Sequence, residues 1–224
     1  MDFRVLIDNF EFLIIQGLLG FGDFAGGTLR LALPAIFFGS IFGLLIGLGR
    51  LARSPWARIP ATIYVAFFRG VPLVMVIFWF WFAIPILLGI PLPVYGVALA
   101  AFIVFEAAYL GEIVRAGIQS IPRGQLEAAT STGLTQSQTM RCVVLPQALR
   151  NMIPALVTQF IVLFKDTSLA SIIGYVDLTK AAQIVNNREI RPFELYLFIA
   201  VVYWLCTYSM SRYARRLERR LTPG

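Results

Sequence analysis

The run Lys165-Asp166-Thr167-Ser168 is an unusual polar group, because it lies inside an apolar stretch, eleven to fourteen residues beyond Pro154. At about 1.5 Å per helical residue it falls near the middle of a bilayer, where ionisable side chains are costly and tend to line water-filled paths. Four consecutive residues cannot share one helix face, so the run predicts a local break that exposes backbone groups. A cation, an anion and two hydroxyls could together hold a ligand of mixed charge. The alternative is an internal Lys165–Asp166 pair that only holds the break.

Four further charged residues lie in or beside apolar stretches. Glu106 is well inside one of them and has no cation near it in sequence, so we expect it to pair with Lys165 or an arginine in preference to contacting a ligand. Glu112 and Arg115, three residues apart on one helix face, predict a supporting ion pair. Arg69 ends a segment broken by two prolines, and we expect it to support an elbow at the inner membrane interface.

Several kinds of chemistry are excluded by residues that the chain lacks. It has no histidine, and its two cysteines, Cys142 and Cys206, lie far apart, which argues against a metal site, a His-based proton relay and a disulfide framework. The carboxyl groups of Glu106 and Asp166 are not at an identifiable catalytic spacing. No phosphate-binding loop of the G-x4-G-K-[ST] type is present. We therefore expect no catalytic residues, no ATP hydrolysis and no bound cofactor in this chain.

Composition shows which elements must position these residues. Hydrophobic residues make up 58% of the 224 residues and charged residues only 14%, against roughly 25% in ordinary globular domains. So much apolar material needs lipid, and we predict an all-α polytopic membrane protein. The net charge is +7, but the arginines cluster at the ends of apolar runs, where they set membrane orientation, so nucleic-acid binding is not expected.

Five apolar stretches predict five transmembrane helices within residues 28–215. They are Leu29–Gly49, Val71–Ile90, Leu92–Val114, Pro154–Tyr175 and Leu195–Ser211. Residues 1–27 precede them, and within these residues Phe3–Leu19 is too short and too polar to span, which predicts an interfacial helix. Three glycines spaced four apart, from Gly39 to Gly47, predict that another helix approaches the first stretch closely.

Arginine placement predicts the orientation of the helices. With the N-terminus outside and the C-terminus in the cytoplasm, the cytoplasmic segments receive most of the arginines, and the basic tail, residues 216–224, is cytoplasmic. These arginines are Arg50, Arg53, Arg58, Arg69, Arg115, Arg123, Arg141, Arg150, Arg212, Arg215, Arg216, Arg219 and Arg220. The other side receives an acidic N-terminus, an uncharged turn and a loop in which basic and acidic residues balance.

The third predicted connection is too long for a simple turn and too regular for disorder. Gln125–Ser131 is typical of a short helix that Gly133 ends, and Thr135–Val144 is typical of a second one, ended at Leu145-Pro146. Two short helices joined at a glycine would form a compact bracket able to seat in a groove of another protein. A bracket without a partner is the alternative.

The residues of this bracket resemble a known motif. Glu127-Ala128-Ala129, three residues, Gly133, nine residues and Val143-Val144-Leu145-Pro146 are similar to the EAA motif, E-A-A-x3-G-x9-I-x-L-P, of the membrane subunits of ATP-binding-cassette importers. Val143 stands where that motif has Ile. The resemblance implies that residues 123–146 form coupling helices that seat in a cleft of a cytoplasmic ATPase subunit. The residues it assigns to this contact are Glu127, Ala128, Ala129, Gly133, Leu145 and Pro146.

Longer stretches are similar to the importers of polar amino acids, and one resembles the glutamate/aspartate type most. The first set comprises Phe68–Leu73, Phe105–Ile121, Arg123–Gln125 and Lys165–Leu169, and the second Pro72–Val76 with Phe78–Phe80. The resemblance implies a multi-pass protein of the bacterial inner membrane with a periplasmic N-terminus. It also implies three kinds of partner chain: a second permease subunit, identical or a paralogue, an ATPase dimer that holds ATP and Mg, and a periplasmic amino acid-binding protein.

The resemblance implies an amino acid substrate, glutamate or aspartate before glutamine. Lys165 would then pair with a carboxylate, Asp166 with the ammonium group, and Thr167 and Ser168 would add hydrogen bonds. Whether these residues touch substrate or only hold a helix break stays open. Residues 20–27 are inserted relative to the family pattern. The alternative function, a stand-alone secondary transporter, would need internal repeats or titratable groups along a path, and the sequence shows neither.

Overall fold

The computed structural model describes residues 3–21 and 26–221, and all of the regular elements in these residues are helical. Four helices are long and apolar enough to cross a membrane, and a bent pair raises the number to five. In chain order the elements are α1 (Arg4–Asp8), η1 (Glu11–Leu19), α2 (Thr28–Leu51), α3 (Pro55–Gly70), α4 (Leu73–Phe78), η2 (Trp79–Ala83), α5 (Ile84–Leu88), α6 (Val94–Gln119), α7 (Arg123–Ser131), α8 (Gln136–Thr139), η3 (Met140–Val144), α9 (Leu145–Asp166), η4 (Thr167–Ile173), α10 (Leu178–Glu189) and α11 (Pro192–Leu221). Here η1, η2 and η3 are π-helical and η4 is a 3-10 helix.

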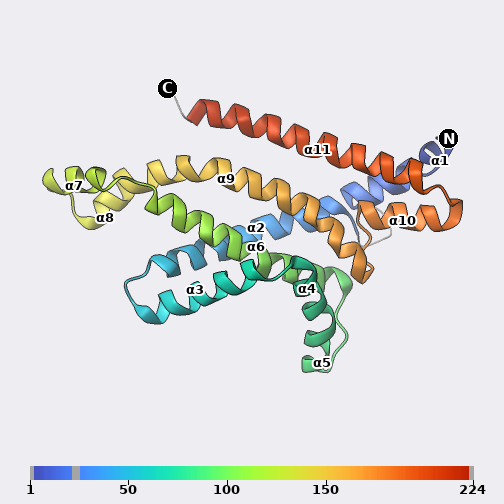
Figure 1. The fold of residues 1–224 in the computed structure, drawn as a ribbon, viewed down its shortest axis with the longest axis horizontal. Coiled ribbons are helices and arrows are strands. Elements are labelled where there is room, and N and C mark those ends of the chain that lie inside the picture. The colour runs from blue at the N-terminus through green and yellow to red at the C-terminus, as the bar shows by residue number, and fades with distance from the viewer. Residues whose placement is uncertain (1–2, 22–25, 222–224) are drawn as a thin grey trace.

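The long helices α2, α6, α9 and α11 extend along one axis, and α4 and α5 project from their side (Figure 1). The pairs α2–α6, α6–α9 and α9–α11 are in contact. The short helices α7 and α8 lie at one end of this bundle, whereas α1 and α10 lie at the other (Figure 1). The bundle therefore has two ends of different construction, with the predicted coupling bracket at one of them.

The packing of α2 on α6 depends on glycine, as the sequence predicts. A Cβ atom at Gly43 would lie 2.6 Å from the Cβ of Leu110, and one at Gly47 would lie 2.7 Å from the Cβ of Val114. Real Cβ atoms do not approach so closely, and the helix axes would have to move apart. The missing side chains thus let the two backbones meet, which confirms the prediction of close packing along this stripe.

The predicted span Val71–Ile90 is helical from Leu73 to Leu88. Helix α3, which precedes it, packs against α2 and α6, and the helical stretch that begins at Leu73 is bent away from α3 by 105°. The break follows from Pro72, which has no N–H and which forces Val71 out of helical geometry, to φ −108° and ψ 139°. The second candidate span is therefore a broken one, made of Pro55–Gly70 and Leu73–Leu88.

Helices α8, η3, α9 and η4 form one continuous helical stretch, Gln136–Ile173. The stop predicted at Leu145-Pro146 is wrong, whereas the start of the membrane span at Pro154 stays a prediction. Pro146 lies ten residues into this stretch, just after the π-helical η3, and the helix continues past it through this altered turn.

The polar run also lies within this stretch. A break was expected at Lys165–Ser168, but the helix does not unwind there. Helix α9 ends at Asp166, and the chain continues directly into the tighter 3-10 helix η4.

The N-terminal segment packs against the end of the bundle opposite the bracket. Leu13 of η1 is completely buried, and Gly17 lies close to Leu178 of α10. Thr28 joins the two, because its Oγ1 donates to the carbonyl of Gly17 at 3.3 Å and accepts from the N–H of Leu178 at 3.2 Å. An interfacial position of Phe3–Leu19 stays a prediction. Of the inserted residues 20–27, residues 22–25 lie outside the described part of the chain.

Asp177, between the spans, fixes the start of α10. Its carboxylate oxygens accept from the N–H groups of Lys180 (2.9 Å) and Thr179 (3.0 Å), and Oδ2 also accepts from the Tyr203 hydroxyl of α11 at 3.2 Å. Complete burial raises the pKa of Asp177 to about 6, although these hydrogen bonds act in the opposite direction. The residue thus caps one helix and ties it to a second.

Candidate functional site

A cavity of about 370 Å³ lies where α3 breaks, between α6 and α9. Four polar side chains line it: Arg69 at the end of α3, Tyr109 of α6, and Gln159 and Asp166 of α9. The guanidinium carbon of Arg69 lies 5.5 Å from the centre of the Tyr109 ring, a cation–π distance. The cavity therefore presents a cation, an anion and an amide within a largely apolar bundle.

Glu106 stands behind this cavity and positions one of its walls. It is completely buried, and its two carboxylate oxygens both accept from Nε2 of Gln159 at 3.1 Å. The sequence analysis expected a cation, Lys165 or an arginine, as the partner of Glu106. The structure gives Gln159 instead, which satisfies both oxygens without a charge and holds the amide beside the cavity.

The four residues of the polar run take different positions. Asp166 lines the cavity. Lys165 is exposed and does not line it. Thr167 is buried, and its hydroxyl donates to the carbonyl of Phe164 at 2.7 Å, whereas Ser168 is half-buried. The cation at the cavity is thus Arg69, which the sequence analysis assigned to a supporting role.

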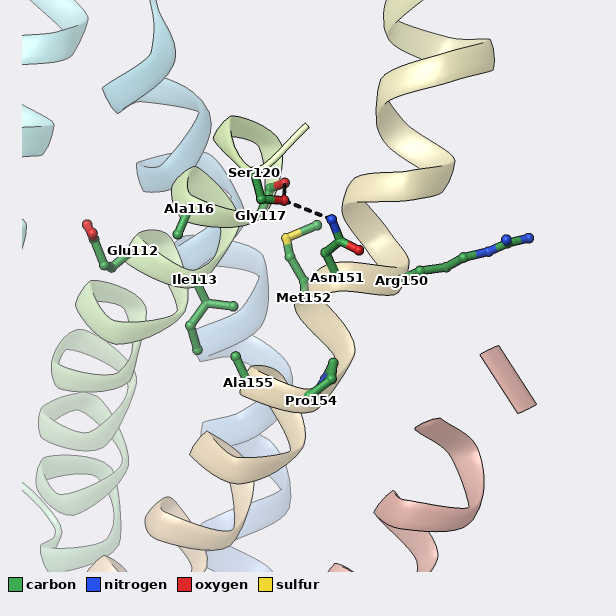
Figure 2. A pocket seen from close by; sticks show the side chains of 10 residues that line it. All are labelled: Glu112, Ile113, Ala116, Gly117, Ser120, Arg150, Asn151, Met152, Pro154 and Ala155. Carbon is green, nitrogen blue, oxygen red and sulfur yellow. Dashed lines mark hydrogen bonds between the residues drawn. The ribbon is translucent and has the colours of Figure 1, made fainter. Parts of the chain in front are cut away.

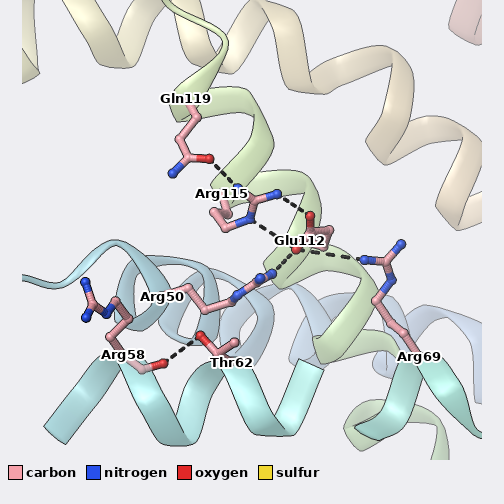
Figure 3. Close-up of polar contacts among 7 residues, drawn as sticks. All are labelled: Arg50, Arg58, Thr62, Arg69, Glu112, Arg115 and Gln119. Atoms are coloured by element: carbon pink, nitrogen blue, oxygen red, sulfur yellow. Dashed lines mark hydrogen bonds and ion pairs between the residues drawn. The ribbon is translucent and has the colours of Figure 1, made fainter. Parts of the chain in front are cut away.

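Glu112 gathers three arginines from three helices on the side of this cavity that is nearer the bracket (Figure 3). Arg115 and Glu112 form the ion pair that their spacing predicts, and Arg50 of α2 binds the same carboxylate. Arg69 reaches it more loosely, at 3.9 Å, and is the most exposed of the three arginines. Arg69 is consequently shared between the cavity with Asp166 and the Glu112 cluster, defined here as Glu112 with Arg50, Arg69 and Arg115.

A second, larger cavity of about 560 Å³ separates the parts of α6 and α9 that are nearer the bracket (Figure 2). Glu112 and Arg150 stand at its edges and point away from each other (Figure 2). Asn151 donates to the hydroxyl of Ser120 at 2.9 Å across it. Its lining is otherwise small and apolar, so the cavity offers few groups that could hold a polar ligand.

The predicted coupling bracket is exposed and is built by specific local signals. Helix α7 ends at Gly133, whose φ of 81° is a conformation that favours glycine. Thr135 then starts α8 with a capping box, because its hydroxyl accepts from the N–H of Gln138 while the Gln138 side chain accepts from the N–H of Thr135. The bracket is therefore a defined turn between two helix ends.

The motif residues differ in exposure. Glu127 and Ala128 are exposed on α7, whereas Ala129 is buried against the bracket itself. A side chain at Gly133 would meet no other atom within 4 Å, so the turn stands clear of the rest of the chain. Leu145 is half-buried and Pro146 exposed at the start of α9. The structure thus exposes Glu127 and Ala128 of the motif at the end of the bundle.

This architecture is that of a known family of membrane proteins. The sequence model of the family "binding-protein-dependent transport system inner membrane component" matches residues 35–223. The chain belongs to this family. It is therefore a multi-pass protein of the inner membrane, built from several apolar helices.

Named relatives in this family cover nearly the whole chain. A probable glutamine ABC transporter permease protein of Bacillus subtilis is 42% identical over 198 residues, which are 87% of this chain and 90% of that protein. A glutamate/aspartate import permease protein of Escherichia coli O6:H1 is 39% identical over 203 residues, 86% of this chain and 89% of the relative. The crystal structure of an amino acid ABC transporter with histidines superimposes with a TM-score of 0.91, at 34% identity and with 98% and 99% of the two chains covered.

The sequence analysis missed Gln159 and Tyr109 as cavity residues. The signal for Gln159 is its spacing, since it lies seven residues before Asp166 on one helix and so shares a face with it. Tyr109 lies three residues after Glu106 on α6. Both residues are neutral, and a search for charges in apolar stretches passes over them.

Proposed function

We propose that this chain is the permease subunit of an ATP-driven importer of polar amino acids, with acidic amino acids, glutamate and aspartate, as its substrates. The observation that carries the proposal is the cavity with Arg69, Gln159 and Asp166. Opposite charges and an amide on one cavity are the chemical complement of an amino acid, which carries an ammonium group and a carboxylate. The named relatives are glutamine and glutamate/aspartate permeases, which supports the same substrate class.

Each cavity residue has a proposed role. The carboxylate of Asp166 binds the substrate ammonium group, and the guanidinium of Arg69 binds a carboxylate in a charge-assisted, two-point contact. Gln159, whose Nε2 is held by Glu106, offers its amide oxygen as an acceptor for the ammonium group. The exposed Lys165 attracts anionic substrates toward the cavity entrance, and Thr167 and Ser168 stabilise the α-to-3-10 transition beside Asp166.

The preference for an acidic side chain rests on charge. Arg69 contacts Glu112 only at 3.9 Å and is 44% exposed, which leaves N–H donors for a substrate carboxylate. The residues that follow the bend between α3 and α4, Pro72–Val76 with Phe78–Phe80, resemble the glutamate/aspartate type. Glutamine is the second candidate, because a glutamine permease of Bacillus subtilis is 42% identical to this chain.

Energy would reach the cavity through the bracket. We propose that Glu127, Ala128 and Ala129 of α7, with Gly133, Leu145 and Pro146, form the surface that seats in a separate cytoplasmic ATPase dimer, which binds ATP and Mg. The exposure of Glu127 and the open space at Gly133 support this contact. A second permease subunit, identical or a paralogue, completes the pathway. A periplasmic binding protein docks at the end of the bundle that carries α1 and α10.

Uptake by the reconstituted importer tests the function. Proteoliposomes that contain this chain, its second permease subunit and the ATPase should accumulate labelled glutamate only with internal ATP and with the binding protein outside. Excess unlabelled aspartate should compete at least tenfold better than glutamine. Uptake without ATP would show a secondary transporter and would overturn the proposal, and stronger competition by glutamine would transfer the proposal to that substrate.

Two substitutions separate the roles of cavity and bracket. Asp166→Asn should lower uptake at least tenfold while the ATPase still co-purifies, because only the charge that binds the ammonium group is lost. Glu127→Lys should abolish uptake and ATPase co-purification together, and Tyr213→Lys, at an exposed position of α11 outside the bracket, is the control. Normal uptake by Asp166→Asn, or intact coupling in Glu127→Lys, would contradict the corresponding role.

A further inference from the structure

Helix α3 carries an apolar face that no other part of the described chain covers. Trp56, Ile59 and Ile63 are 90%, 54% and 63% exposed. Together with Pro55 and Pro60 they line a shallow, almost entirely apolar groove of about 450 Å³. Since α3 begins just after the inner end of α2, this groove starts at the cytoplasmic boundary and extends toward the membrane interior.

Several arginines near the start of this groove have no acidic partner of their own. The stretch from Arg50 to Arg69 contains no acidic residue. Glu112 neutralises only one of the three arginines that it gathers from α2, α3 and α6. Arg53 donates to the uncharged side chain of Gln136 at 3.3 Å. The cluster and its surroundings thus keep a surplus of positive charge.

Arg58 is the clearest case of this surplus. Within the described residues, its guanidinium group forms no ion pair and no hydrogen bond. Only its backbone is engaged: the N–H donates to the carbonyl of Ser54 at 3.1 Å, and the carbonyl accepts from the hydroxyl of Thr62 at 2.8 Å (Figure 3). It lies in the first turn of α3, one residue before Ile59. A long, unpaired cation therefore stands at the boundary end of an apolar groove.

We propose that this face of α3 binds one anionic phospholipid of the inner leaflet. Arg58 and Arg53 bind the headgroup phosphate, and an acyl chain lies along Trp56, Ile59 and Ile63. The order of charge and apolar surface along α3 matches the order of headgroup and chain in the leaflet. Trp56 sits at the junction, the depth that tryptophan favours in membranes. This site is separate from the substrate cavity and does not depend on the proposed substrate.

Charge complementarity selects this occupant over others. An apolar helix of a second protein would fill the groove but would leave the Arg58 charge unmatched, and a zwitterionic lipid would offer a phosphate already paired with its own cation. An anionic headgroup satisfies both parts of the site. One arginine near a charged membrane surface contributes a factor of about five in affinity.

Fluorescence of Trp56 in the full-length chain tests the site. The chain has four tryptophans, so replacing Trp79, Trp81 and Trp204 by Phe leaves Trp56 as the single reporter. In phosphatidylcholine vesicles, brominated phosphatidylglycerol should quench it at about a fivefold lower mole fraction than brominated phosphatidylcholine. Arg58→Gln should abolish most of this difference, whereas Arg123→Gln, an exposed arginine at the start of α7, should leave it unchanged.

Two results would overturn the proposal. Equal quenching by both lipids would show that the face meets only bulk lipid, and absence of quenching by either would show that protein covers it. A second measurement avoids the triple substitution: native mass spectrometry of the wild-type chain should retain a phosphatidylglycerol adduct that Arg58→Gln loses. Equal retention of phosphatidylglycerol and phosphatidylcholine by the wild-type chain would contradict the site as well.

Discussion

The pair formed by Glu106 and Gln159 makes the packing behind the cavity measurable. Gln159→Leu removes the amide that donates to both carboxylate oxygens of a completely buried side chain. Removing one partner of a buried hydrogen bond costs about 1–3 kcal/mol, because the group that remains has lost both water and its partner. We therefore expect Gln159→Leu to lower the free energy of unfolding by about 1–3 kcal/mol. Replacing both residues by Leu should cost less than the sum of the single changes, by about 2 kcal/mol.

The assay is unfolding of the wild type, both single variants and the double variant in detergent micelles, followed by circular dichroism. Gln147→Leu is the matched control, because Gln147 lies on the same helix and its Nε2 donates to the backbone carbonyl of Val143 at 3.0 Å. That change should cost about 1 kcal/mol. Additivity of the Glu106 and Gln159 changes within about 0.5 kcal/mol would refute the pairing, and with it the argument that Glu106 holds Gln159 at the cavity.

Three other changes test the packing, the turn and the cap. Gly43→Ala should destabilise the protein by about 1–3 kcal/mol in the same unfolding assay, because its Cβ would overlap with Leu110. Gly49→Ala, in ordinary contact distance on the same helix, should stabilise it by up to about 1 kcal/mol. Gly133→Ala should weaken ATPase co-purification several-fold without lowering the melting temperature of the bundle, since only the exposed turn is strained. For Asp177, a pKa raised from 3.8 to about 6 means that the folded protein binds the proton more tightly than the unfolded chain. Stability should therefore be greatest below about pH 4 and fall by up to about 3 kcal/mol as pH rises past 6, and Asp177→Asn should remove this slope in melting curves.

Each of these has a result that would contradict it. Equal stability of the two alanine variants of α2 would show that the helices are not in glycine-limited contact. Unchanged ATPase binding by Gly133→Ala would mean that the turn geometry does not matter for docking. A melting temperature of the wild type that rises between pH 4 and pH 6.5 would show that the ionised carboxylate of Asp177 is the stabilising form.

Hydropathy predicts where apolar helices lie but not where they bend. The starts of α2, α6 and α11 were predicted within three residues, because long apolar runs have few alternatives in lipid, whereas α6 and α11 extend five and ten residues past the predicted ends. The predicted span Val71–Ile90 agrees with the helical stretch Leu73–Leu88, but a window average counts Pro72 as one more apolar residue and does not predict the 105° bend between α3 and this stretch. Pro146 caused a different error, because the helix continues past this proline directly after the π-helical η3.

The candidate site was predicted in part for a similar reason. Asp166 was identified as a candidate site residue because a charge in an apolar stretch is rare, and Asp166 does line the cavity. Gln159 is neutral and carries no such signal, although it determines where the buried carboxyl group of Glu106 points. Arg69 was predicted to have a structural role. That it also lines the cavity depends on the bend between α3 and α4, and residue spacing alone does not show where this bend places the side chain.

The continuous helical stretch from Gln136 to Ile173 connects the bracket directly to the cavity. Its start belongs to the bracket and Asp166 lies thirty residues further on, which is about 45 Å at the rise of an α-helix. If such a rod tilts by about 5° about one end, the other end moves by about 4 Å, more than the radius of a water molecule. A small rotation at the bracket end would thus be enough to open or close the space beside Asp166, and no separate relay between the two ends is required.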